Sequence, residues 1–130
     1  MEDPVKLRLA LFSAALCSMT SLVHAADAGH GAVVFKKCMA CHTATAPTNR
    51  VGPSLQNLVG RAVATAENFK YSQAMKDFGA GKVWDEATLT AYLAAPRQVV
   101  KGTYMAFPGL KAPEDIADVI AYLKDPAAAN

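Results

Sequence analysis

Apolar residues recur at helical spacing near both ends of this chain. The first stripe predicts a helix over residues 28–41, with apolar positions at i, i+3, i+4 and i+7, namely Gly31, Val34, Phe35 and Cys38. Gly31 either lets another helix approach closely or loosens the start of the helix. The last stripe predicts a helix from Pro113 to a stop at Asp125-Pro126. Its apolar positions are Ile116, Val119, Ile120 and Leu123.

The middle of the chain predicts shorter elements. Asp85 is a suitable N-cap for a helix that Pro96 would end. We expect short helical pieces over residues 52–60 and 71–78, and the whole pattern predicts an all-α fold. The buried face of the helix after Asp85 would be Leu89, Tyr92 and Leu93. Irregular segments or loops are expected over 43–51, 61–69 and 97–110, with a frayed end over 126–130.

The first residues are expected to be removed rather than to fold. Two basic residues precede an apolar run over residues 9–16, which is too short to span a membrane. Val23-His24-Ala25 fits the small-x-Ala pattern of signal-peptide cleavage. We therefore predict a signal peptide over residues 1–25, one domain over residues 26–130 and a periplasmic location. An uncleaved membrane anchor is the alternative.

Charge and cysteine content narrow the function classes. The chain has a formal net charge of +2, and the predicted leader contains equal numbers of acidic and basic residues. A nucleic-acid partner would require a strong basic excess, so none is expected. Cleavage would also remove Cys17 and leave Cys38 and Cys41 as a pair.

Cys38 and Cys41 begin a C-x-x-C-H motif that ends at His42. This spacing is typical of covalent haem attachment, because two thiols on one side of a turn can join one porphyrin while the imidazole binds its iron. The alternatives are a dithiol redox pair and part of a zinc site. A redox pair needs a βαβ setting, of which the sequence shows no sign. A zinc site needs four ligands, and His30 is an atypically spaced fourth.

A haem iron held by His42 needs a second ligand or keeps an open site. Among the methionines after residue 25, Met39 lies inside the motif and cannot reach the opposite face. Met105 lies in the long loop before the last helix, where its side chain could be placed over the haem. Met75 is the remaining alternative.

The segment Lys101–Phe107 resembles the Met-ligand loop of class I cytochromes c. The resemblance is closest to small soluble cytochromes of bacteria and mitochondria. It implies the cytochrome c fold, in which N- and C-terminal helices pack together and a Met-bearing loop closes a haem crevice. It also implies one covalently attached haem c per chain, with His42 and Met105 as iron ligands. Further matches, in the family's order, are Gly52-Pro53, Gly60-Arg61, Phe69-Lys70-Tyr71, Trp84, Pro96 and residues 120–124.

The matching positions imply roles for further residues around the haem. The Pro53 carbonyl would accept a hydrogen bond from the His42 ring, and Tyr92 would lie beside Met105. Phe107 would shield the haem edge. Hydrogen bonds around the propionates would come from Arg61, Tyr71, Trp84 and Thr103.

Two positions depart from the family's pattern. Many members have proline where Lys101 stands. Met75 stands where mitochondrial members carry an asparagine, and it could make the pocket drier and raise the reduction potential.

The resemblance implies an outer-sphere one-electron carrier rather than an enzyme, because an iron bound on both faces leaves no place for a substrate. Its partners would be redox complexes of a respiratory or photosynthetic chain, of the oxidase, reductase or reaction-centre type, with acidic docking surfaces. We expect a monomer without stable membrane insertion. A basic ring around the exposed haem edge would consist of Lys36, Lys37, Arg97, Lys101 and Lys111.

Two alternative functions stay open at this point. A haem enzyme or gas sensor, peroxidase-like, would work after Met105 dissociates. The common two-haem peroxidase design would need a second C-x-x-C-H motif, which the sequence lacks. A module that binds zinc, or that shares only the fold, is the third possibility.

Overall fold

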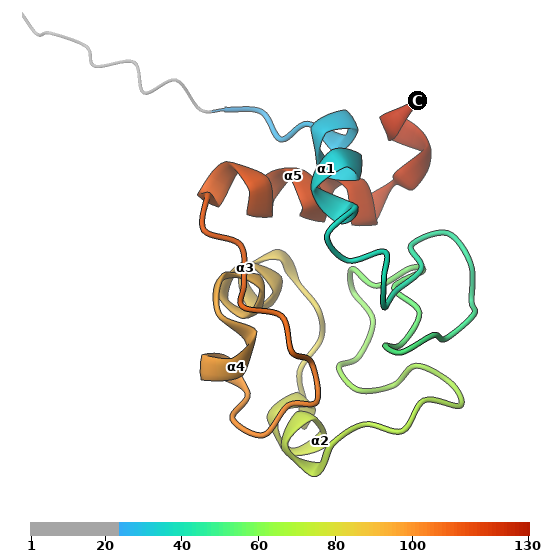
Figure 1. Cartoon of the computed structure of the whole chain (residues 1–130), viewed down its shortest axis with the longest axis vertical. Helices are drawn as coiled ribbons and strands as arrows, with labels where there is room; N and C mark the ends of the chain where they lie inside the picture. Colours follow the sequence, from blue (N-terminus) through green and yellow to red (C-terminus); the bar gives the residue numbers. More distant parts are fainter. Residues whose placement is uncertain (1–23) are drawn as a thin grey trace, which may run out of the picture.

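Helices from the two ends of the chain pack together in the computed structural model, which describes residues 24–130 (Figure 1). The described residues contain one isolated β-bridge, between Ala62 and Val83, and no strand, so the all-α prediction is confirmed. The helices are α1 (Ala28–Phe35), α2 (Gln73–Gly79), α3 (Glu86–Ala94), α4 (Pro96–Val99), α5 (Pro113–Lys124) and the 3₁₀ helix η1 (Pro126–Ala129).

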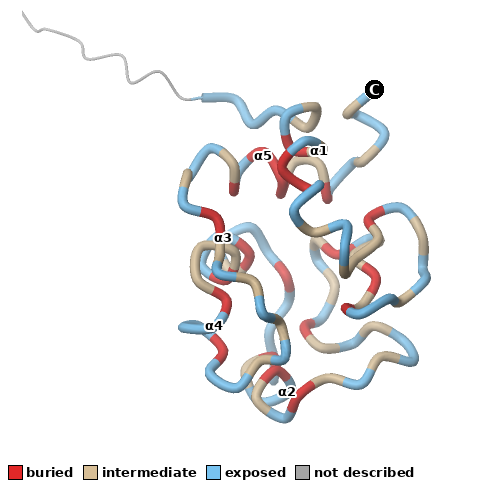
Figure 2. The backbone as a smooth tube through the Cα atoms, in the orientation of Figure 1, coloured by how far each residue is buried: buried red, intermediate tan, exposed pale blue. Residues whose placement is uncertain are grey.

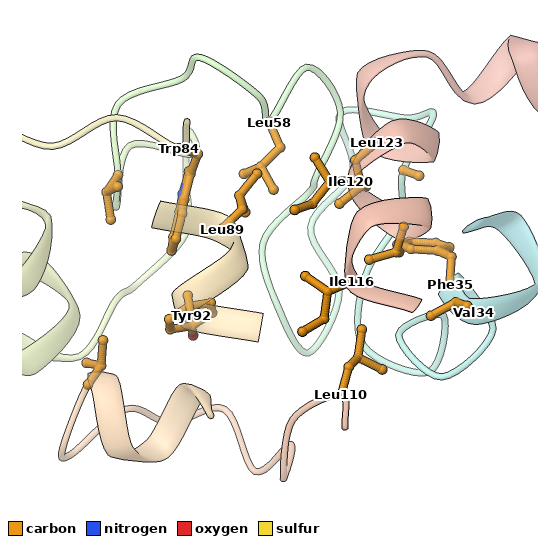
Figure 3. Close-up of a cluster of buried hydrophobic side chains, with 14 of the residues drawn as sticks. Val34, Phe35, Leu58, Trp84, Leu89, Tyr92, Leu110, Ile116, Ile120 and Leu123 are labelled. Carbon is orange, nitrogen blue, oxygen red and sulfur yellow. The ribbon is translucent and has the colours of Figure 1, made fainter. Parts of the chain in front are cut away.

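Gly31 sets how closely α1 and α5 approach. A Cβ atom on Gly31 would lie 2.0 Å from the backbone oxygen of Asp118, so only glycine allows this backbone contact. The close-approach interpretation of Gly31 is therefore confirmed. The rings of Phe35 and Tyr122 also pack, with centroids 5.3 Å apart. The predicted apolar positions of α5 are buried. Figure 2 shows buried segments in both α1 and α5, and Figure 3 shows Ile116, Ile120 and Leu123 in the core with Val34 and Phe35.

A buried carboxylate ties the start of α1 to α5. The side chain of Asp118 is only 3% exposed and accepts hydrogen bonds from the backbone N–H of Asp27 and from His30 Nδ1, both at 2.7 Å. Burial acts to raise the pKa of Asp118, but these two hydrogen bonds and the nearby imidazoles of His24 and His30 hold the pKa below its ordinary value. The charged Asp118 side chain therefore stabilises the fold fully above the ordinary carboxyl pKa. This stabilisation is lost as the pH falls through the lower pKa that Asp118 has in the folded protein.

The first helix is shorter than the predicted range 28–41. It ends at Phe35, and residues 36–41 form turns. The N–H groups of Lys36, Lys37 and Cys38 bond to carbonyls three residues earlier, so the chain tightens into 3₁₀-type turns. Apolar spacing could not reveal this change, because the same stripe continues across both conformations.

The helical piece predicted over residues 52–60 is absent. Asn57 and Gly60 have φ angles of 54° and 88°, which a right-handed helix does not allow. The helix predicted over residues 71–78 is observed as α2, which begins after Ser72. The Ser72 hydroxyl oxygen accepts the N–H of Met75 at 3.1 Å and so caps the helix.

The later helices follow the predicted signals more closely. Asp85 caps α3 by accepting the N–H of Thr88 at 2.7 Å, and α3 stops before Pro96. Pro96 also begins α4, because proline suits the first position of a helix. The rest of α4 occupies the start of the loop that was predicted over residues 97–110. The tail that was expected to fray forms η1, where the Asp125 carboxylate accepts the N–H of Ala127.

Residues 1–23, nearly all of the predicted signal peptide over residues 1–25, lie outside the described residues. The boundary between leader and domain therefore stays a prediction. Within residues 24–130, no helix combines the length and the apolar character that crossing a membrane requires.

Candidate haem site

A cavity of about 400 Å³ opens between the helices and the long loops. Its walls come from α2, α3, α5 and the loops around residues 36–61 and 103–110. The size and the mostly apolar wall suit a small-molecule or cofactor site. The structure brings every predicted site residue to this cavity: Cys38, Cys41, His42, Pro53, Arg61, Tyr71, Trp84, Tyr92, Thr103, Met105 and Phe107.

The C-x-x-C-H motif forms a tight turn at one wall of the cavity. The N–H groups of Cys41 and His42 both bond to the Cys38 carbonyl, at 3.0 and 2.9 Å. Cys38 and Cys41 are free thiols, and both contribute to the cavity wall. Burial raises the pKa of the Cys38 thiol, although Lys37 opposes that rise. The turn therefore offers two reduced thiols to one ligand.

A hydrogen bond fixes the His42 ring. Its Nδ1 lies 2.7 Å from the Pro53 carbonyl oxygen, which can only accept, so Nδ1 carries the proton. Nε2 then keeps its lone pair and can bind a metal. Burial lowers the pKa of His42, against the opposing effect of the Pro53 bond. The ring is thus held in the neutral form that metal binding requires.

Gly52 makes room for the His42 ring. A Cβ atom on Gly52 would lie 2.3 Å from Cε1 and 2.8 Å from both ring nitrogens. Gly52→Ala should displace the ring and lower the free energy of unfolding by about 1–3 kcal/mol. Thermal unfolding of the haem-loaded variant measures this loss. Gly29→Ala in α1 is the control, because its new Cβ would meet only the end of the Asp27 side chain, at 3.1 Å. Equal midpoints for Gly52→Ala and the parent would contradict the steric argument.

Two hydrogen bonds position Met105 at the cavity, one from α3 and one within its own loop. The Tyr92 hydroxyl donates to Met105 Sδ at 3.7 Å, and Thr103 Oγ1 accepts the Met105 N–H at 3.2 Å. Gly102 has a φ of 94°, which favours glycine, and it packs against α2, where a Cβ atom would lie 3.3 Å from that of Ala74. The sulfur of Met105 is therefore positioned by α2, α3 and its own loop.

Arg61 carries an unpaired polar group at the cavity. Its guanidinium donates to the carbonyls of Gln56 and Ser54, at 3.1 and 2.9 Å. Its Nε is the one buried side-chain nitrogen or oxygen within residues 24–130 that lacks a partner. Such a donor suits an anionic ligand group such as a propionate. The Tyr71 oxygen accepts the Ala66 N–H at 3.0 Å, which leaves its own proton free to donate.

These features fit a covalently attached haem. The two thiols match the two attachment points, the His42 ring presents a lone pair, and Arg61 offers an unused donor. The sequence did not reveal that Leu89, Val119 and Leu123 would also line the cavity. Helical spacing predicted their burial but could not tell whether protein or cofactor covers them.

Comparisons with known proteins agree with this site. The family profile described as Cytochrome c matches residues 28–126. Cytochrome c2 of Rhodomicrobium vannielii is 46% identical over 119 residues, covering 90% of this chain and 93% of that protein. Cytochrome c2 iso-2 of Magnetospirillum fulvum is 50% identical over 90 residues, covering 69% of this chain and 92% of that protein. The structure of cytochrome cH from Methylobacterium extorquens gives a TM-score of 0.70 at 41% identity, covering 75% of this chain and 97% of that one. This chain therefore belongs to the cytochrome c family, carries one covalently attached haem c and is an electron carrier rather than an enzyme.

Proposed function

We propose that this protein is a periplasmic carrier that passes single electrons between redox complexes of a respiratory or photosynthetic chain. The observation that carries the proposal is the hydrogen bond from His42 Nδ1 to Pro53, at 2.7 Å. It leaves Nε2 as a metal donor at the same cavity that Met105 lines. Relatives named cytochrome c2 support this assignment.

In this proposal His42 Nε2 and Met105 Sδ would bind the iron, and Cys38 and Cys41 would hold the porphyrin. The bound haem supplies one-electron redox chemistry. The chain holds both ligands in place, because Pro53 fixes the imidazole ring and the Tyr92 hydroxyl donates to the sulfur. Rigid ligands limit rearrangement between oxidation states, and a neutral thioether favours the reduced state.

The polar residues of the cavity wall would receive the propionates. Arg61 is the best supported, since its buried Nε has no partner within residues 24–130. We assign the same role to Tyr71, Trp84 and Thr103, which also line the cavity. Phe107, at the same wall, would shield the haem edge from water.

Basic residues support a partner with an acidic docking surface. Lys37 is exposed and lines the cavity, although its ammonium also lies 3.6 Å from Asp115 in α5. Lys101 is exposed in the loop that carries Met105. Such charges steer association without requiring a large or long-lived interface. We assign Lys36, Arg97 and Lys111, which are also exposed, to the same basic ring.

An absorption spectrum of protein recovered from the periplasmic fraction tests the proposal. We expect a low-spin c-type spectrum with the weak far-red iron–sulfur band, and slow binding of carbon monoxide by the reduced protein. Colourless protein, or five-coordinate iron that binds carbon monoxide rapidly, would contradict an electron carrier with both axial positions filled. Recovery in the membrane fraction would instead indicate an uncleaved leader.

A further inference from the structure

The segment before α1 runs directly past Asp118. The backbone N–H of Asp27 donates to Asp118 Oδ1 at 2.7 Å, and His24 Nε2 lies 3.7 Å from the same oxygen. Consecutive backbone nitrogens are at most about 3.7 Å apart. The nitrogen of Ala26 therefore lies within roughly 6.5 Å of Asp118 Oδ1. Ala26 also lines a small cleft between α3 and α5.

Cleavage after Ala25 would change the charges around this carboxylate. It would remove His24, the imidazole beside Oδ1, and turn the Ala26 nitrogen into a free α-amino group. A free α-amino group is a stronger base than imidazole, with an ordinary pKa of about 7.7–8.0 against about 6.5. The exchange therefore places a mostly charged cation near a buried anion at neutral pH.

We propose that signal-peptide cleavage creates an N-terminal ammonium on Ala26 that pairs with Asp118 and fastens α1 to α5. This inference rests on the proposed export of the protein. The Asp118 side chain is 3% exposed, so a nearby cation offsets the cost of burying its charge. The α-amine of Ala26 would lie well within a Debye length of the carboxylate, even at physiological salt.

The other charged groups around Asp118 and the cleft are largely paired with one another, so an ammonium on Ala26 would add a further cation beside Asp118. On the α1 side, His30 bonds to Asp118 and lies 4.0 Å from Asp115, which in turn pairs with Lys37. On the α3 side of the cleft, Glu86 and Lys124 pair with each other and so largely cancel. Asp27 uses its own carboxylate to cap α1, by accepting the N–H groups of Gly29 and His30.

The proposed pair has a defined dependence on pH. An ammonium that gains a carboxylate partner has a higher pKa in the folded than in the unfolded protein. Its stabilising effect is therefore complete below about pH 7.7 and is lost as the pH rises through the folded-state pKa. The pKa of Asp118 is lowered, so Asp118 stays charged throughout this range and its own protonation does not contribute to the change.

The test compares haem-loaded proteins that differ only at the N-terminus. One begins at Ala26, and the other carries two added glycines before Ala26, which move the amine away from the carboxylate. Each is also made with Asp118→Asn, which keeps an oxygen to accept the Asp27 N–H but removes the charge. Unfolding midpoints are measured from pH 6 to pH 10. The intact mass of periplasmic protein shows whether its chain begins at Ala26.

We expect the protein that begins at Ala26 to unfold about 3–6 °C higher than the extended one at pH 6.5. The difference should vanish near pH 10 and be absent with Asp118→Asn. Equal midpoints at pH 6.5, a difference that persists at pH 10, or a native chain beginning elsewhere would each overturn the inference. If Asp118→Asn fails to fold, the pH dependence in the Asp118 proteins still decides. A c-type spectrum in the extended protein would leave the electron-carrier proposal standing whatever the midpoints show.

Discussion

Replacing Met105 with alanine should abolish the far-red iron–sulfur band and lower the reduction potential, while the haem stays covalently attached. The physical reason is that a neutral thioether stabilises reduced iron more than the water or open position that replaces it. Axial ligands tune haem potentials over about 0.8 V, so a fall of more than about 0.1 V is expected. Potentiometric titration with absorption readout measures both effects. The reduced variant should also bind carbon monoxide faster.

The other two methionines among the described residues serve as matched controls. Met39→Ala should change neither band nor potential, because Met39 is 50% exposed within the attachment turn. Met75 is a stricter control, since it is buried and lines the same cavity as Met105. If the band survived in Met105→Ala but disappeared in Met75→Ala, Met75 would be the ligand instead.

Replacing both Cys38 and Cys41 with alanine should leave a chain that holds no covalent haem and does not fold stably. The empty cavity measures about 400 Å³. Without haem, the apolar side chains of its wall would lose the cofactor that covers them and would face water. A small domain is stable by only about 5–15 kcal/mol, so losing this much buried apolar surface threatens the whole fold. We therefore expect far-UV circular dichroism of the variant to show much less helix than the haem-loaded parent.

Single substitutions separate attachment from folding. Cys38→Ala and Cys41→Ala each keep one thiol, so acid–acetone extraction should leave haem on the chain in both. Extraction should release any haem from the double variant. A double variant that kept the helical signal of the parent without cofactor would contradict the view that the haem supplies a large part of the core.

Local signals in the sequence were sufficient for much of the fold. The N-cap of Asp85 and the proline start of α5 depend on neighbouring residues alone, and both were correct. Where a signal depended on backbone geometry instead, prediction failed. The apolar stripe continued past Phe35 although the helix did not, and Asn57 entered the left-handed region that excludes a helix over residues 52–60.

The sequence by itself was enough to predict the attachment chemistry, because the spacing of Cys38, Cys41 and His42 is a local property of one turn. It also predicted Met105 as the second iron ligand, through the resemblance of its loop to a known family. Only the tertiary structure decided how distant residues meet. It placed the Pro53 carbonyl against the His42 ring, left Arg61 Nε without a partner and brought the segment before α1 to Asp118. Such contacts join residues far apart along the chain, and their geometry depends on how the helices pack.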